Sequence, residues 1–163
     1  MRNTLFLSLL FLLFSTFSFA QRNYDTAIGA RLGYPLSVSA KKYISDQGAI
    51  EGYLGFRGFS TYNWVSLSGA YLHHDDLEID ELPNLSWYFG GGASAYFWRY
   101  RSSFISDSGG TSFGLQGYLG LEYTFEDVPL NLTIDWIPSL FFNGFFSGFG
   151  GGYGSLGVRY VLE

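Results

Sequence analysis

The segment from Ser155 to Leu162 alternates strictly between two kinds of side chain. One parity holds Leu156, Val158, Tyr160 and Leu162, and the other holds Ser155, Gly157 and Arg159. Successive side chains of a β-strand point to opposite faces, so this segment predicts a strand with one apolar and one polar face. Such a strand at the C-terminal end of a chain is typical of the closing strand of a membrane-spanning β-barrel.

The same alternation recurs along the chain and predicts eight strands. They cover Tyr24–Gly33, Leu36–Ile44, Ala49–Phe59, Tyr62–Leu72, Leu85–Arg99, Ser112–Phe125, Leu130–Phe142 and Gly152–Leu162. Most of them approach the about 9–11 residues that a tilted strand needs to cross a bilayer. Turn-forming sequences such as Ser45–Gly48 and Glu126–Pro129 separate them. We therefore predict an all-β fold, an eight-stranded antiparallel up-and-down transmembrane β-barrel.

The charged residues of these strands almost all share the small, polar parity. A soluble barrel places apolar side chains inside and charged ones outside, which is the reverse arrangement. The apolar face is therefore expected to meet lipid and the charged face to line the lumen. A soluble ligand-binding barrel of lipocalin type, with an apolar and empty interior, is the alternative. Aromatic residues near the predicted strand ends indicate membrane-interface girdles: Tyr43, Trp64, Tyr71, Trp87, Tyr123 and Tyr160.

The first twenty residues have the pattern of a secretory signal peptide: a basic Arg2, an apolar run, and small residues before a cleavage site after Ala20. An N-terminal membrane anchor is the alternative, although the run is short for a spanning helix. Cleavage would remove Arg2 as the only charge and leave one domain, 21–163, with 8 basic and 14 acidic residues. This acidic balance argues against a nucleic-acid partner. The chain has no cysteine, which excludes disulfides and a lipoprotein anchor.

Seven charged side chains point into the predicted lumen by parity: Arg31, Lys41, Arg57, Arg159, Glu51, Glu122 and Asp135. The lumen of an eight-stranded barrel has room for side chains but not for a wide pore. Unpaired buried charge is costly, so we expect these groups to form a salt-bridged plug. A gated ion path is the alternative. Inward-facing glycines, among them Gly120 and Gly157, would leave space for large inward side chains.

The densest polar cluster is His73, His74, Asp75 and Asp76, in a predicted acidic loop from His73 to Asn84. Imidazole and carboxylate groups are competent metal ligands, but this spacing matches no defined metal loop. We therefore expect a solvated turn, with no metal and no cofactor. A lipid-modifying outer-membrane enzyme would need a serine and a histidine oriented by an acid at the outer edge. With an even number of strands and both ends of the barrel chain in the periplasm, the connections between strands 2 and 3, 4 and 5, and 6 and 7 are periplasmic. Both histidines are then predicted on the periplasmic side, so we predict that the protein is not an enzyme.

Three segments carry a resemblance to a known group: Trp87–Ala93, Gly120–Phe125 and Pro129–Trp136. The chain resembles the small eight-stranded outer-membrane barrels, namely the OmpA transmembrane domain and OmpX-like proteins. It looks most like uncharacterised outer-membrane β-barrel proteins of Bacteroidetes-type bacteria. The resemblance implies the barrel fold over residues 24–162 and the outer membrane of a Gram-negative bacterium, but it brings no established activity.

The expected function is accordingly a structural or surface-interaction role. The expected partners are outer-membrane lipids and, during biogenesis, the barrel-assembly machinery, and the protein is expected to be a monomer. Substrates of that machinery usually end in an aromatic residue, whereas this chain ends in Val161-Leu162-Glu163 with Tyr160 before them.

Overall fold

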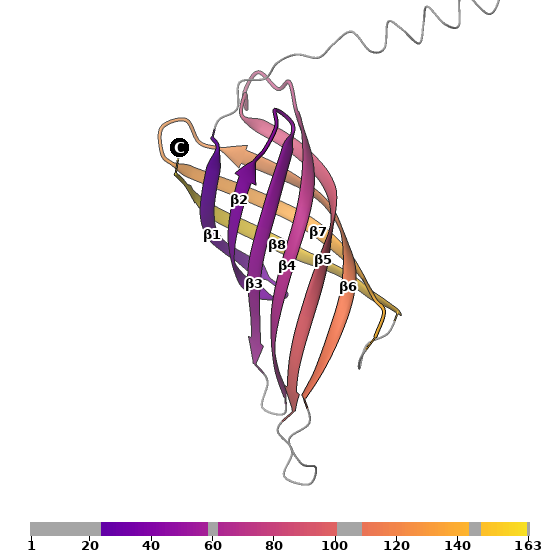
Figure 1. The fold of residues 1–163 in the computed structure, drawn as a ribbon. Helices are drawn as coiled ribbons and strands as arrows, with labels where there is room; N and C mark the ends of the chain where they lie inside the picture. Colours follow the sequence, from indigo (N-terminus) through magenta and orange to yellow (C-terminus); the bar gives the residue numbers. More distant parts are fainter. Residues whose placement is uncertain (1–23, 59–61, 101–108, 144–147, 163) are drawn as a thin grey trace, which may run out of the picture.

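The protein is a closed β-barrel in the computed structural model, which describes residues 24–58, 62–100, 109–143 and 148–162 (Figure 1). The strands are β1 (Thr26–Gly33), β2 (Leu36–Tyr43), β3 (Gly48–Gly58), β4 (Tyr62–Asp76), β5 (Leu85–Tyr100), β6 (Gly109–Thr124), β7 (Leu130–Phe141) and β8 (Gly148–Val161). In the described part of the chain, no helix is long and apolar enough to cross a membrane. The predicted signal peptide, residues 1–20, lies outside the described residues.

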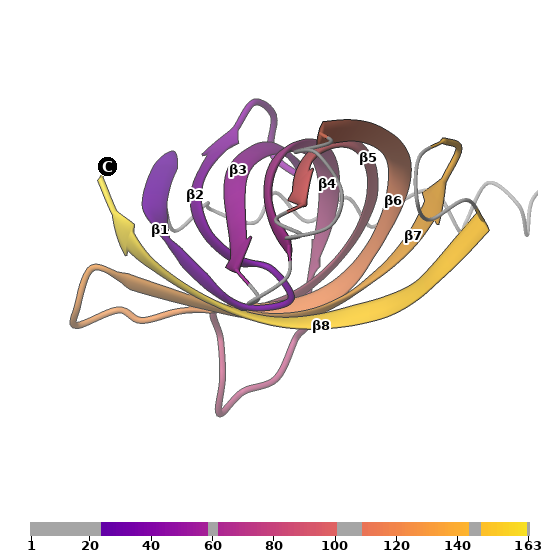
Figure 2. The ribbon, with the colours of Figure 1, turned by 90° about the horizontal axis from the view of Figure 1, so that it is seen from below.

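Each strand pairs antiparallel with the next one, and β1 pairs with β8. The closing pair runs in continuous register from Ala27 opposite Val161 to Gly33 opposite Ser155. Viewed from below in Figure 2, the strands follow one another in chain order and β8 returns to β1. The predicted eight-stranded up-and-down barrel is therefore confirmed.

The two faces of the sheet have opposite chemistry. Adjacent residues in a strand separate cleanly: Leu54 is 43% exposed while its neighbour Tyr53 is 4% exposed, and Ile134 is 59% exposed while Asp135 is 5% exposed. The outward face is thus apolar, and charged side chains lie inside. This is the arrangement that a barrel in a bilayer requires, and the reverse of a lipocalin-type barrel.

The barrel has two distinct ends. We call the end that carries the start of β1 and the end of β8 the terminal end. The connections between β2 and β3, β4 and β5, and β6 and β7 lie there as well, because each strand reverses direction. We call the opposite end the far end. The turn between β1 and β2, which contains the cis Tyr34–Pro35 peptide bond, lies at the far end.

Four strands extend, at one of their ends, beyond the bounds that the alternation of apolar residues predicts. β4 continues to Asp76, which pairs with Ser86 of β5, so the prediction of a loop beginning at His73 is wrong. β6 begins at Gly109, β8 begins at Gly148, and β5 reaches Tyr100. The physical reason is that backbone pairing with a neighbouring strand continues after the apolar side chains stop.

The girdle prediction is wrong for Trp64 and incomplete for Tyr43. Trp64 is only 2% exposed and lies inside the barrel, because it shares the inward parity of Ser66. The Tyr43 hydroxyl donates a hydrogen bond to Glu122 in the lumen. Tyr71 and Tyr160 are exposed on the outer face, as predicted. An aromatic residue near a strand end indicates a girdle only when its parity is outward.

Arginine substitutions should distinguish the middle of the outward face from its edge. Leu119→Arg places a charge on the outward face near the middle of β6, and we expect it to lower the free energy of unfolding by about 2–4 kcal/mol in lipid vesicles. Phe125→Arg, just beyond β6 at the terminal end, should cost about 0–1 kcal/mol. Denaturant unfolding of the vesicle-embedded variants, followed by gel mobility, measures both. Equal costs for the two variants would contradict a bilayer that surrounds the apolar outward face.

Candidate functional site

Four charged side chains meet in the middle of the lumen. Arg31 on β1 lies between Glu51 on β3 and Asp135 on β7, with Nη1 2.8 Å from Glu51 Oε1 and Nη2 2.5 Å from Asp135 Oδ2. Arg159 on β8 places its Nη2 2.5 Å from the same Glu51 Oε1. All four side chains are almost fully buried. We call this group the central cluster, and Glu51 is its shared anion.

Neutral hydroxyl groups satisfy other donors of the central cluster. Arg159 donates from Nε to Ser39 Oγ at 3.1 Å and from Nη1 to Thr133 Oγ1 at 3.1 Å. Arg31 Nε donates to Ser155 Oγ at 3.2 Å. Charge-assisted hydrogen bonds of this kind offset part of the cost of removing a guanidinium from water.

A second group lies nearer the terminal end. Lys41 on β2 forms an ion pair with Glu122 on β6, and its Nζ lies 2.8 Å from Nε2 of His74 on β4. His74 Nε2 is 3.4 Å from Glu122 Oε2. The hydroxyls of Tyr24 and Tyr43 donate to Glu122 Oε1 at 2.6 and 3.2 Å. We call this group the terminal cluster.

Tyr24 lies before β1 and acts as a neutral donor in the terminal cluster. Burial, together with the negative charge of Glu122, raises the pKa of its phenol well above the ordinary value. The Tyr24 hydroxyl therefore keeps its proton and its hydrogen bond to the carboxylate at neutral pH.

The two clusters contain six of the seven predicted lumen charges. The cations Arg31, Lys41 and Arg159 face the anions Glu51, Glu122 and Asp135. The seventh, Arg57, lies apart near the far end, with its guanidinium carbon 4.1 Å from the centre of the Tyr34 ring. Three cations and three anions leave the two clusters without net charge when His74 is neutral.

Two glycines make room for the central cluster. A Cβ atom at Gly120 would lie 2.6 Å from Tyr88 Cζ and 2.7 Å from Asp135 Cβ. A Cβ atom at Gly157 would collide with the Thr133 hydroxyl and lie 3.1 Å from Arg159 Nη1. These glycines therefore allow large polar side chains of neighbouring strands to approach the sheet closely.

The residues His73–Asp76 do not form a single polar cluster, because successive side chains of β4 diverge. His74 points inward and is buried, whereas His73 lies on the outer side, 3.8 Å from Asp75 Oδ1. The expectation of a solvated turn is therefore wrong for His74. Counting in twos from Ser66 places His74 on the inward parity, and this signal would have found it. Among the described residues, no three His, Asp or Glu side chains are grouped in a way that could hold a metal ion.

The fold has counterparts among solved structures. The chain is similar to Neisserial surface protein A (NspA), with a TM-score of 0.56 and 20% identity over 85% of this chain and 94% of that one. It is also similar to the N-terminal β-barrel domain of Pseudomonas aeruginosa OprF, with a TM-score of 0.60 and 15% identity over 84% of this chain and 95% of that domain. No protein-family model and no curated protein sequence matches the chain. At these identities, the likeness shows the barrel fold.

Removal of the shared anion should destabilise the barrel strongly. Glu51→Gln leaves two buried guanidinium groups with too little negative charge, and we expect it to lower the free energy of unfolding by about 3–5 kcal/mol. The matched control Glu126→Gln, in the exposed turn after β6, should change it by no more than about 0.5 kcal/mol. Denaturant titration in detergent micelles measures both variants.

A double-mutant cycle tests the coupling in the terminal cluster. The pair Lys41→Met and Glu122→Gln should cost less together than the sum of the single changes, because the double variant removes both charges. Additive costs would contradict an energetically coupled ion pair.

Proposed function

We propose that this protein is a monomeric, non-enzymatic barrel of the outer membrane of a Gram-negative bacterium, with a closed lumen and a structural or surface-interaction role. The observation that carries the proposal is the combination of an apolar outer face with a charge-balanced polar interior. Among membrane-spanning structures, a closed barrel is the form of sheet that satisfies every backbone hydrogen bond in lipid.

The apolar outward face supports the proposal that lipids surround the barrel. The predicted signal peptide and the resemblance to outer-membrane barrels support export and insertion by the barrel-assembly machinery. Pairing of β1 with β8 leaves no free sheet edge for a second copy to extend, which supports a monomer.

The position of the two clusters supports a closed lumen. The central cluster joins side chains from β1, β3, β7 and β8, and the terminal cluster joins β2, β4 and β6. Ion pairs thus connect strands that are not neighbours in the sheet and cross the interior. A path for ions would have to break these pairs, so the salt-bridged plug is favoured over the gated ion path.

The surroundings of the histidines support a non-enzymatic role. A serine nucleophile needs a histidine within hydrogen-bond reach as its base. Within the described residues, neither His73 nor His74 is hydrogen-bonded to a serine, and His74 Nε2 faces Lys41 and Glu122. The lipid-modifying alternative therefore lacks its catalytic arrangement in this part of the chain.

Labelling of single cysteines tests both location and orientation, because the natural chain contains none. Asn143→Cys lies beyond β7 at the far end, and Asp46→Cys lies in the turn between β2 and β3 at the terminal end. The proposed orientation places the terminal end in the periplasm and the far end outside the cell. A membrane-impermeant maleimide added to intact cells should therefore label the first variant only, and both after permeabilisation of the outer membrane. Labelling of Asp46→Cys alone in intact cells, or release of the protein without detergent, would overturn the proposal.

Electrical recording tests the closed lumen. The purified wild type in a planar bilayer should show no steady conductance, because side chains fill a barrel of this size. A porin of about 16 strands in the same bilayer serves as the positive control. Stable single-channel steps from the wild type would refute the plug and favour the ion path.

A further inference from the structure

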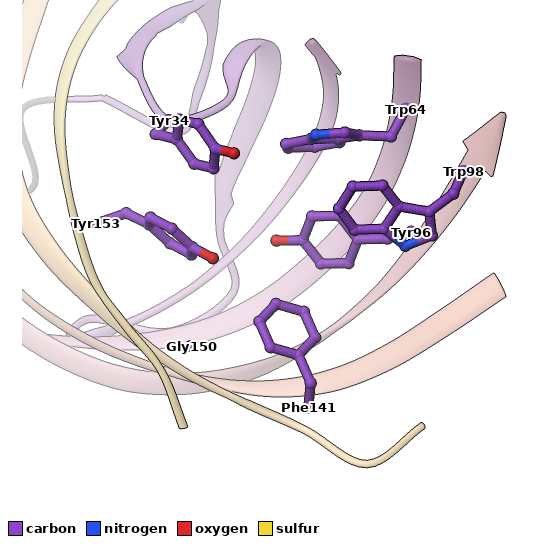
Figure 3. A pocket seen from close by; sticks show the side chains of 7 residues that line it. All are labelled: Tyr34, Trp64, Tyr96, Trp98, Phe141, Gly150 and Tyr153. Atoms are coloured by element: carbon purple, nitrogen blue, oxygen red, sulfur yellow. The ribbon is translucent and has the colours of Figure 1, made fainter. Parts of the chain in front are cut away.

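A cavity of about 310 Å³ opens at the far end of the barrel, away from the two charged clusters. Its lining consists of Tyr34, Trp64, Tyr96, Trp98, Phe141, Tyr153 and Gly150 (Figure 3). We call it the aromatic cup. Among the described residues, none that lines the cup is charged.

Ring contacts hold the walls of the cup in place. On one side Tyr34 stacks on Tyr153 with ring centroids 5.2 Å apart. On the other side the Tyr96 ring lies 5.0 Å from that of Trp64 and 5.2 Å from that of Phe141. Tyr34 also contacts Trp64 edge to face, with ring centroids 5.8 Å apart, and Figure 3 shows Tyr153 and Tyr96 facing each other across the cavity. A site formed by mutually packed rings is organised before any ligand arrives.

The cup also contains neutral polar groups. The hydroxyls of Tyr34, Tyr96 and Tyr153 point toward the space between the two walls in Figure 3. Trp64 Nε1 is buried and has no hydrogen-bond partner, whereas Trp98 Nε1 donates to Ser112 Oγ at 3.1 Å. Because Trp64 Nε1 is shielded from the cavity, the three phenol hydroxyls are the groups of the cup that can hydrogen-bond to a bound molecule.

We propose that the aromatic cup binds an uncharged saccharide unit. A pyranose ring has an apolar C–H face that packs on an aromatic ring and hydroxyls at its edge that both donate and accept hydrogen bonds. The cup offers aromatic surfaces together with phenol hydroxyls, which match both features. The neutral chemistry of its lining matches the absence of charge on the ligand.

Other ligand classes fit the cup less well. A cation is disfavoured because the Arg57 guanidinium already lies over the Tyr34 ring. A purely apolar molecule would leave the tyrosine hydroxyls that face it without hydrogen bonds. The cup lies within the ring of strands, so a free sugar or the end of a soluble glycan reaches it more directly than a lipid headgroup.

Tryptophan fluorescence of the purified, folded protein tests the proposal. The variant W87F/W136F removes two of the four tryptophans and leaves the signal to Trp64 and Trp98 in the cup. The protein is kept in lauryldimethylamine oxide, a detergent without a sugar headgroup. Methyl β-D-glucopyranoside, methyl β-D-galactopyranoside and maltose are each titrated through the millimolar range. At least one should give a saturable change, whereas sorbitol, a polyol without a ring, should give none.

Two tyrosines of β8 provide a matched pair of variants in this background. Tyr153→Phe removes a hydroxyl that faces the cup and should weaken sugar binding by about three- to ten-fold. Tyr160→Phe removes a hydroxyl from the outer face and should leave binding unchanged. Heat-modifiable gel mobility verifies that both variants are folded.

Absence of saturation with all three sugars, or an equal effect of the two tyrosine variants, would overturn the proposal. A saturable response to cyclohexanol that Tyr153→Phe strengthens, with none to the sugars, would overturn it in favour of an apolar ligand. Access of sugars from outside the cell rests on the proposed orientation. The titration uses purified protein, so its result is independent of the cysteine labelling that tests orientation.

Discussion

The pairing of β1 with β8 is the contact on which the rest of the structure depends. It closes the sheet, so that no backbone edge remains to be satisfied in an apolar environment. Closure with eight strands also sets a narrow interior, which side chains must fill. Charged groups placed there must then find partners within the barrel, and the ion pairs of Arg31, Arg159 and Lys41 meet this requirement.

The interior is divided along the barrel axis. The ion pairs occupy the middle and the terminal end, and the aromatic cup occupies the far end. Charged pairs that cross the interior make a rigid, tightly hydrogen-bonded region. The rings enclose a cavity because flat side chains of this size pack edge to face and leave space between their tips. The lumen therefore has one region that ion pairs cross and another that contains a cavity.

The fold and the inward position of the charges could be predicted from the sequence, because the period-2 pattern directly reports which face a side chain occupies. Strand ends could not: β4 continues through His74 by backbone pairing, where the apolar alternation has stopped. The ion-pair partner of each charged residue could not be predicted from the sequence either. Arg159 and Glu51 belong to β8 and β3, which are not neighbours in the sheet, so their contact depends on the curvature of the whole barrel. The aromatic cup could not be predicted either, because the position of Trp64 near a strand end indicates an outer girdle, whereas its side chain is buried in the lumen.

The double attachment of Glu51 has a consequence for assembly. Its two cationic partners sit on the first and last strands, which are also the strands that seal the cylinder. In a partly wound sheet that lacks β8, Glu51 would lack its Arg159 partner, and the central cluster would hold one cation and two anions. The central cluster therefore becomes neutral in the same step that closes the barrel. This step gives the completed barrel a lower energy than an unfinished sheet.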